Sequence, residues 1–366
     1  MMIRPLKAAW QRAELWFWGK FFILLIALGA GTRRRRMSHN NGIAGRGTVR
    51  IVANPQFPAT EFFEPGLVYP CRLRHGAAGF MDDTMGLVRS ASLKFADSDF
   101  AGPLDVQMNT GNHCFFWTAR SFLEFAFSRH PHDGMEYEEF YRKHAEGRLS
   151  AASSLIRPPS SFAQLYYHSH TPFAWRARDG KPRYVRFRLQ PEDRGPMSAA
   201  PDPEFVIRAA GDPGMARQLA DQKAAPDETR NVNYLKNEWR DRVESQGARY
   251  HLQIQLHEVS PADSDQVRNS LIPWNESTHP YLDLAEVEIT EVLSPAESAY
   301  MAFEITNLPA SMGILPARSL DDYNSLNYMR QQSIWAIRTR RFLTRRFGPV
   351  APVPDDAPHN LSPKGM

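Results

Sequence analysis

The sequence predicts an α+β domain built on an antiparallel β-barrel, with flanking helices and an N-terminal membrane helix. Three observations lead to this prediction. Short alternating or β-rich runs, separated by clusters of Pro, Gly and Asp, recur in both halves of the chain, as is typical of strands in antiparallel sheets. Blocks of strand and helix follow one another without regular βαβ units, which favours an α+β architecture. An apolar stretch near the N-terminus predicts the membrane helix.

Size and charge narrow the class of protein. The 366 residues can form one large domain or two ordinary ones, and a hydrophobic fraction of 42% can build a substantial core. A net charge of +4 is too small to predict nucleic-acid binding. Cys71 and Cys114 lie far apart without metal-ligand spacing, so we expect two buried thiols.

The N-terminal apolar stretch, residues 14–31, is flanked by the arginines of residues 33–36. A membrane span needs about 20 apolar residues, and this stretch is shorter and contains Lys20. A spanning helix, a helix on the membrane surface and a buried helix of the core therefore all remain open. The arginines would keep the main domain on the cytoplasmic side of a span or bind anionic headgroups. We predict a membrane-associated protein with its main domain on the cytoplasmic side.

The rest of the chain divides into recognisable blocks. The expected elements are strands within residues 45–116, helices within 121–150 with a break near Pro131 and Gly134, a strand pair around the turn at 178–181, a polar connector at 195–229, a strand at 248–259, and one long helix at 319–347. The long helix opens with a serine cap and ends in arginines, as the helix dipole favours. We predict three parts: the membrane-associated segment 1–37, the main domain 38–345 and a disordered, Pro-rich tail 346–366.

No P-loop, dinucleotide fingerprint, G-x-S-x-G or H-E-x-x-H motif is present, so the mechanisms that these motifs indicate get no support. Four subtler groupings remain. In the first, His39 is followed by Gly42, Gly45 and Gly47. This spacing suggests a backbone that passes close to a flat or bulky group, although a histidine in such a loop can also be merely solvated.

The other three groupings lie further along the chain. Asn109 sits in a polar turn before an aromatic run. His168 and His170 share one face of a strand, but they lack a third ligand that would complete a metal site. Tyr323 and Tyr328 lie among polar residues and arginines near the start of the long helix.

Taken in order, the four groupings resemble the catalase superfamily. The run from Cys71 to Trp117 is similar to a catalase stretch with a strand arginine, a strand ending in K-F, a D-x-x-x-N pattern and an aromatic pair. The tripeptide S-H-T at residues 169–171, with the aromatic strand and D-G turn that follow, also matches. His39 and its glycine spacing are similar to the catalase-like allene oxide synthases. The resemblance covers residues 38 to about 345.

The resemblance implies a haem protein that binds haem b with its iron. His39 would be the distal acid and base, and Asn109 would hydrogen-bond the outer oxygen of a bound peroxide. The glycines would let the loop approach the porphyrin face. Arg74 would pair with a haem propionate, and Phe122 would stack on the ring.

The family holds its iron with a helical tyrosine whose phenolate is stabilised by an arginine four residues earlier. The best match for this metal ligand is Tyr323, with Arg318 five residues before it and Arg330 further on as cofactor-binding residues. Tyr328 is the alternative ligand. The five-residue offset points Arg318 about 140° around an ideal helix, away from the tyrosine.

Three functions follow from the resemblance. The first is a haem-dependent enzyme that acts on organic hydroperoxides, above all those of fatty acids, by O–O cleavage at a tyrosinate-ligated iron. The membrane segment favours it, because lipid hydroperoxides partition into bilayers. The second is a catalase-like or peroxidase-like scavenger of hydrogen peroxide. The third is a haem-free, membrane-bound binding protein, since an alignment anchored on Arg330 places Ile334 or Trp335 at the ligand position.

Overall fold

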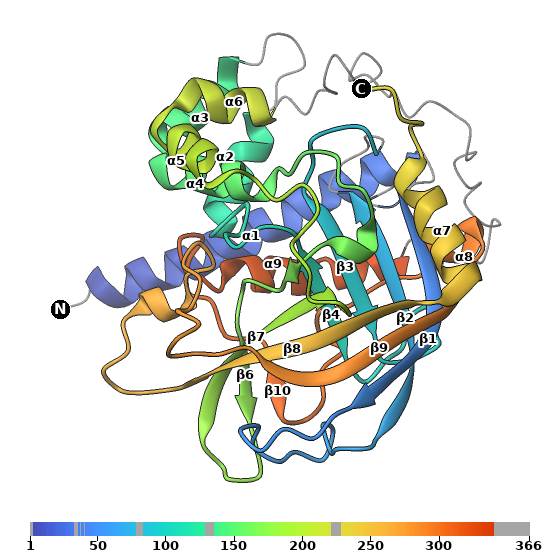
Figure 1. Cartoon of the computed structure of the whole chain (residues 1–366). Coiled ribbons are helices and arrows are strands. Elements are labelled where there is room, and N and C mark those ends of the chain that lie inside the picture. The colour runs from blue at the N-terminus through green and yellow to red at the C-terminus, as the bar shows by residue number, and fades with distance from the viewer. Residues whose placement is uncertain are drawn as a thin grey trace.

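The structure is a computed structural model that describes residues 3–32, 36, 38–39, 41–77, 83–128, 135–220 and 228–339. A β-barrel lies beside a group of helices, and the long helix α1 (Ile3–Thr32) runs past both (Figure 1). The predicted tail at 346–366 lies outside the described residues, as does the predicted break near Pro131 and Gly134. Residues 33–35 of the arginine run also lie outside them.

Eight antiparallel strands form the closed barrel. They are β1 (Gly42–Ile51), β2 (Val68–Ala77), β3 (Arg89–Lys94), β4 (Asp105–Asn109), β5 (Tyr167–His168), β7 (Pro182–Pro191), β8 (Ala248–Glu258) and β9 (Leu282–Val292). β7 pairs with both β5 and β8, and β9 pairs with both β8 and β1, which closes the ring. The short strands β6 (Phe173–Arg176) and β10 (Met312–Gly313) extend the sheet beside β7. The predicted α+β class with an antiparallel barrel core is confirmed.

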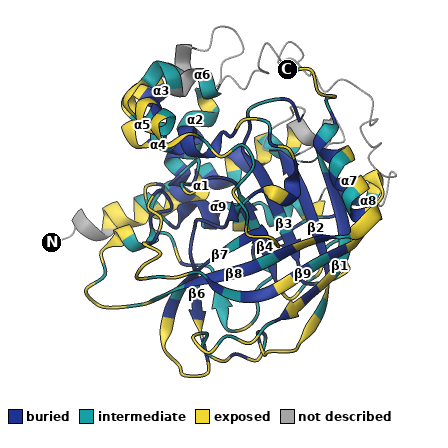
Figure 2. Ribbon diagram, viewed as in Figure 1, coloured by how far each residue is buried: buried dark blue, intermediate teal, exposed yellow. Residues whose placement is uncertain are grey.

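The core of the molecule fills the barrel, as the buried colouring of the strands in Figure 2 shows. Leu73, Leu93, Val106, Phe187 and Ile254 come from five different strands and are each 0% exposed. Because successive strand residues face opposite sides of a sheet, alternate residues of each strand meet inside the ring. Each such side chain stabilises the fold by about 1.5–3 kcal/mol relative to its exposed state.

The helix α7 (Tyr234–Gln246) packs against the barrel through Trp239. The Trp239 Nε1 donates a hydrogen bond of 2.9 Å to the Tyr250 hydroxyl, which also lies 3.0 Å from Nε2 of His75. The His75 ring stacks on Phe162. Trp239, Tyr250 and His75 therefore form a hydrogen-bonded polar group inside an otherwise apolar core, as is usual for buried polar side chains.

Gly45 and Gly47, which follow His39, allow β1 and β9 to approach each other closely. A Cβ at Gly47 would lie 1.8 Å from the Glu288 carbonyl oxygen, and one at Gly45 would lie 2.5 Å from the Ile289 side chain. The register between β1 and β9 shifts next to Gly47, and glycine commonly occupies such irregular positions. The close approach that the spacing predicted is real, but its partner for these two glycines is strand β9.

Five helices form the group outside the barrel: α2 (Ala119–Phe127), α3 (Met135–Lys143), α4 (Ala145–Ser154), α5 (Pro203–Gly211) and α6 (Pro213–Ala220). The Thr118 side chain caps α2 and forms a capping box with Ser121. Helices α5 and α6 lie within the stretch 195–229 that was predicted as a polar connector, so that prediction is wrong there. Each begins with a proline, which is favoured in a first helical turn.

The predicted long helix at 319–347 begins later than expected. Helix α9 runs over Ser325–Gln332 and is followed, after an interruption at Ser333, by another helical turn at 334–339. Asn324, and not Ser319, stands at the N-cap. Asp322 accepts hydrogen bonds from the backbone N–H groups of Arg318 and Asn324, and such local bonds compete with helix formation.

Helix α1 packs along α9 and α2, where Leu15 and Phe22 join a cluster with Leu123 and Met329. No helix among the described residues is both long enough and apolar enough to cross a membrane. Charged residues such as Lys20 interrupt the apolar stretch. The predictions of a membrane helix and of a membrane-associated protein with its main domain on the cytoplasmic side are therefore wrong.

A buried ion pair links β3 to β4. The Lys94 Nζ lies 2.7 Å from both carboxylate oxygens of Asp105, and both side chains are 0% exposed. Asp105 also accepts hydrogen bonds from the backbone N–H of Glu304 and from the Asn307 amide. Burial raises the pKa of Asp105 while Lys94 opposes the shift. The pair thus joins the β3–β4 hairpin to the segment that leads towards β10.

We expect Asp105→Asn to lower the free energy of unfolding by about 3–5 kcal/mol, because it leaves the buried Lys94 ammonium without its counter-charge. Urea denaturation followed by circular dichroism measures the change. The double variant Lys94→Met/Asp105→Asn should recover part of the loss. An Asp105→Asn protein as stable as the wild type would contradict this role of the pair.

Candidate functional site

His39 lies in the short segment between α1 and β1, with a backbone φ of 54°. This left-handed conformation is uncommon for a residue other than glycine. Arg74 on β2 contacts the segment: its Nη2 donates to the His39 carbonyl at 2.9 Å, and its Nε donates to the Ser298 carbonyl at 3.0 Å. The Nδ1 of His39 lies 3.0 Å from the Ser38 hydroxyl. Residues held in such conformations cluster at functional sites.

The surroundings of His39 keep its imidazole neutral. Burial, followed by the positive charges of Arg74, Arg36 and Arg330, lowers the pKa of His39 to about 3. Its Nε2 is buried and has no hydrogen-bond partner among the described residues, although the residue as a whole is half-buried. A neutral imidazole has one nitrogen that donates and one that accepts. His39 can therefore exchange a proton with a ligand bound beside it.

One row of the barrel links His39 to Asn109. Gly42, three residues after the histidine, lies opposite Gly76 on β2. Gly76 lies opposite Ser90 on β3, and Ser90 lies opposite Asn109 at the end of β4. Adjacent strands are about 4.8 Å apart, so both polar side chains belong to the same end of the barrel. Asn109 is half-buried, and its side chain makes no hydrogen bond to another described residue.

Arg330, on α9, lies near the same group. Its charge is among those that lower the pKa values of His39 and His170. The Nη1 of Arg330 donates to the Asn327 side-chain oxygen at 3.2 Å. Of the predicted site residues, the structure thus brings His39, Arg74 and Arg330 into one electrostatic neighbourhood.

The tyrosines proposed as metal ligands have other neighbours. The Tyr323 hydroxyl accepts a hydrogen bond from Gln266 Nε2 at 2.9 Å, and its ring lies beside the cluster around Leu271. Tyr328 packs against the cluster that joins α9 to α1 and α2. Arg318 lies outside α9, and its backbone N–H donates a hydrogen bond to the Asp322 carboxylate. The roles of Tyr323 and Arg318 in metal and cofactor binding stay predictions.

Phe122 lies on α2 as predicted from its helical context. Its ring is edge-on to Phe116 at 5.0 Å and to Phe22 at 5.1 Å. It therefore belongs to an aromatic cluster that connects the segment after Cys114 to helix α1. Stacking of Phe122 on a porphyrin, like the pairing of Arg74 with a propionate, stays a prediction.

Sequence reasoning missed two residues near the site. Arg36 was assigned to a membrane-binding run, but its guanidinium donates to the carbonyl groups at the end of α8 (Pro295–Tyr300) and beyond it, including that of Met301. Burial lowers the pKa of His75, in the barrel, to about 3. His75 stands in a strand of alternating pattern, and this pattern could have indicated that its side chain is buried. His170, from the S-H-T tripeptide, lies 2.7 Å from the Gly111 carbonyl oxygen through its Nε2.

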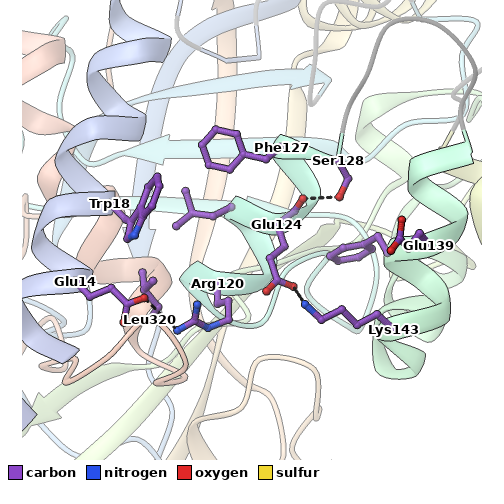
Figure 3. Close-up of a pocket in the computed structure, with 11 residues that line it drawn as sticks. Glu14, Trp18, Arg120, Glu124, Phe127, Ser128, Glu139, Lys143 and Leu320 are labelled. Atoms are coloured by element: carbon purple, nitrogen blue, oxygen red, sulfur yellow. Dashed lines mark hydrogen bonds and ion pairs between the residues drawn. The ribbon is translucent and has the colours of Figure 1, made fainter. Parts of the chain in front are cut away.

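A surface cleft of about 660 Å³ lies between α1, α2 and α3 (Figure 3). Trp18 and Phe127 contribute apolar surface to it. Several of its charged side chains form ion pairs, because Arg120 binds Asp321 at 2.6 Å and Glu124 binds Lys143 at 3.0 Å. The two cations of the cleft, Arg120 and Lys143, are therefore already bound to carboxylates. His39 does not line the cleft.

No family model matches the chain. It is 36% identical over 346 residues to an allene oxide synthase-lipoxygenase protein of Plexaura homomalla, across 93% of this chain and 31% of that protein. It is 27% identical over 305 residues to a linolenate 9R-lipoxygenase of Nostoc, across 80% of this chain and 37% of that protein. An uncharacterized protein of Sinorhizobium fredii is 32% identical over 229 residues, which cover 91% of that protein. The chain spans about a third of the length of the first two relatives.

Solved structures of catalases share the fold. A bacterial catalase matches with a TM-score of 0.63 and 16% identity, over 86% of this chain and 58% of the catalase. A fungal catalase matches with a TM-score of 0.63 and 17% identity, over 92% of this chain and 65% of the catalase. The closed antiparallel barrel with its flanking helices is thus a catalase-type domain. The fold and the 36% identity to the Plexaura protein both support the resemblance to the catalase superfamily.

The free energy of unfolding should decrease as the pH is lowered, because buried histidines such as His75 stay neutral in the folded protein. The pKa of His75 is about 3 in the folded protein, whereas an unfolded histidine titrates near 6.5. The unfolded state therefore binds more protons below pH 6.5, and His75 alone should cost about 1.4 kcal/mol per pH unit there. We expect His75→Gln to reduce the slope of unfolding free energy between pH 6 and pH 4.5 by about that amount. Urea denaturation across this range measures it, and an unchanged slope would show that His75 is not buried as a neutral group.

Proposed function

We propose that this protein is a haem-dependent enzyme that acts on fatty-acid hydroperoxides by cleaving the O–O bond. The observation that carries the proposal is the half-buried, neutral His39, whose buried Nε2 has no partner among the described residues and which stands three residues before the barrel row that ends at Asn109. The catalase-like fold and the named relatives support a hydroperoxide-acting enzyme. A fatty-acid substrate is supported by the allene oxide synthase and linolenate lipoxygenase names of two relatives.

The residues around His39 fit a haem on their side of the site. The buried Nε2 of His39 and the side chain of the half-buried Asn109 have no hydrogen-bond partners among the described residues, and a ligand bound beside them would satisfy both. When bound, haem b would supply the iron at which the hydroperoxide O–O bond breaks. The proposal does not depend on which protein group would bind the iron.

His39 and Asn109 have separate tasks in this proposal. His39 takes the proton of the hydroperoxide on the nitrogen that accepts, and it can return that proton to the oxygen that leaves. Asn109 donates from its amide to the outer oxygen and stabilises the charge that develops there. Arg74 and Arg36 keep the imidazole neutral before the reaction, so that a site for the proton is available at neutral pH.

A scavenger of hydrogen peroxide is the second candidate, and the catalase folds of the solved relatives favour it. Linoleate hydroperoxide and hydrogen peroxide should be offered separately to the protein reconstituted with haemin. We expect new lipid products from the first and slow oxygen evolution from the second. Rapid oxygen evolution without a lipid product would instead support the scavenger.

His39→Gln should lower kcat/KM for linoleate hydroperoxide by about 100-fold or more, because the proton then lacks its acceptor. Steady-state kinetics on the reconstituted protein measure the loss. His251→Gln is the matched control, since His251 on β8 bonds a backbone carbonyl, that of Glu192. Equal activities of the His39→Gln and wild-type proteins would remove His39 from the mechanism.

The axial ligand predicted from the sequence has its own test. If Tyr323 provides the phenolate, Tyr323→Phe should shift the Soret band and abolish the charge-transfer band of a tyrosinate-ligated haem, and Tyr328→Phe should leave both unchanged. The reverse result would assign Tyr328. Spectra that neither substitution alters would exclude both tyrosines as ligands.

A further inference from the structure

Helix α1 has a second apolar face, which the other described residues leave exposed. Its buried face packs on α9 and α2 through Leu15 and Phe22. Exposed residues are visible along the same helix in Figure 2. Most of the large apolar side chains that are exposed among the described residues belong to it: Leu6, Trp10, Trp16, Phe17, Phe21, Leu24, Leu25 and Leu28. Single exposed apolar side chains are ordinary, but a continuous apolar face marks an interaction surface.

The exposed residues at positions 6, 10, 13, 17, 21, 24 and 28 form one stripe along α1, and Ala13 is the small residue among them. Successive members are three or four residues apart, so they share one face of the helix. The spacing repeats after eleven residues, which turn only about 20° further than three full turns. The stripe therefore runs nearly parallel to the helix axis for about 33 Å.

The area of this face is that of a stable protein contact. Trp10 is 73% exposed and Leu28 is 58% exposed, and Trp16 and Leu25 border the stripe on either side. With them, the exposed parts of these large side chains amount to roughly 800 Å². A standard interface buries about 800 Å² on each partner, whereas the largest apolar patch of a typical monomer covers about 300–600 Å².

The order of residues in the stripe favours a second copy of the chain as the partner. Counted from Phe17, the other members lie four, seven and eleven residues away in both directions. Two copies of α1 that run antiparallel and meet at Phe17 therefore place every member opposite a member of the other stripe. Phe21 then faces the partner's Ala13, and a large side chain opposite a small one packs closely. A symmetric dimer requires a surface that is complementary to itself in this way.

We propose that the chain forms a homodimer in which the exposed stripe of α1 pairs antiparallel with the same stripe of a second copy. The two-fold axis passes beside Phe17. Pairing uses only the exposed face, so the packing of α1 on α9 and α2 stays as it is. The antiparallel arrangement also brings the positive end of each helix dipole near the negative end of the other. The proposal is independent of the proposed function, because neither the contact nor its test involves haem or a hydroperoxide.

Sedimentation equilibrium of the full chain in detergent-free buffer tests the dimer. We expect the wild type to sediment with twice the mass of the 41.7 kDa chain. Phe17→Glu/Leu24→Glu should raise the dissociation constant of the dimer by about 100-fold or more, because it places charges in an apolar contact. Both residues are exposed in the protomer, so circular dichroism should show an unchanged fold.

Ile207→Glu is the matched control, because Ile207 on α5 is also an exposed apolar residue of a helix. It should leave the dimer intact. A wild type that stays monomeric at about 100 μM overturns the proposal, and so does a dimer that Phe17→Glu/Leu24→Glu does not weaken. Monomers that sediment with phosphatidylcholine vesicles would also overturn it, since lipid would then cover this face.

Disulfide cross-linking tests the antiparallel arrangement. Cys71 and Cys114 are buried, so an introduced cysteine is the accessible thiol. Phe17→Cys should yield a disulfide-linked dimer on mild oxidation, because residue 17 faces its own copy across the axis. Leu6→Cys and Leu28→Cys should cross-link when the two variants are mixed, and neither should cross-link alone. A disulfide between two copies of Leu6→Cys would indicate parallel helices and would overturn the proposed pairing.

Discussion

Pairing between β7 and β8 is the interaction on which the rest of the structure depends. It turns an open sheet into a ring, because it joins β8, which otherwise pairs only with β9, to the strand that continues through β5 to the rest of the sheet. Closure leaves no free edge within the ring and defines an inside that the apolar side chains fill. It also fixes the rows across the strands. The row from Gly42 to Asn109 then sets which polar residues meet at one end of the barrel.

The site is built where that end of the barrel meets α9, and its electrostatics are those of a cationic interior. Arg74 contributes twice, since it donates to the His39 carbonyl and also helps to keep the imidazole neutral. A neutral histidine keeps one ring nitrogen that can accept the proton of a bound hydroperoxide, as the proposed function requires.

Several features were predictable because they depend on local pattern. Period-2 alternation identified the strands that became β2, β7 and β8, and the D-G turn before Lys181 became the connection between β6 and β7. The order of His39, Asn109 and the S-H-T tripeptide indicated the superfamily. Local pattern predicted the wrong helix start where two local preferences compete. The stretch before α9 has an apparent serine cap at Ser319, but the side chain of Asp322 organises turns there instead.

The apolar N-terminal helix shows most clearly what the sequence alone could not predict. Its sequence determined that it would be helical and apolar, but not what would cover it, because a membrane and the surface of α9 bury the same side chains by the same hydrophobic effect. Phe22 packs against α2 because the fold places α2 there. In the same way, the sequence by itself determined several strands, among them β2, β7 and β8, although it did not predict β9, and it indicated His39 and Asn109 as candidate site residues. Only the tertiary structure decided which charges surround His39, since electrostatic contacts depend on distances that strand register and helix packing create.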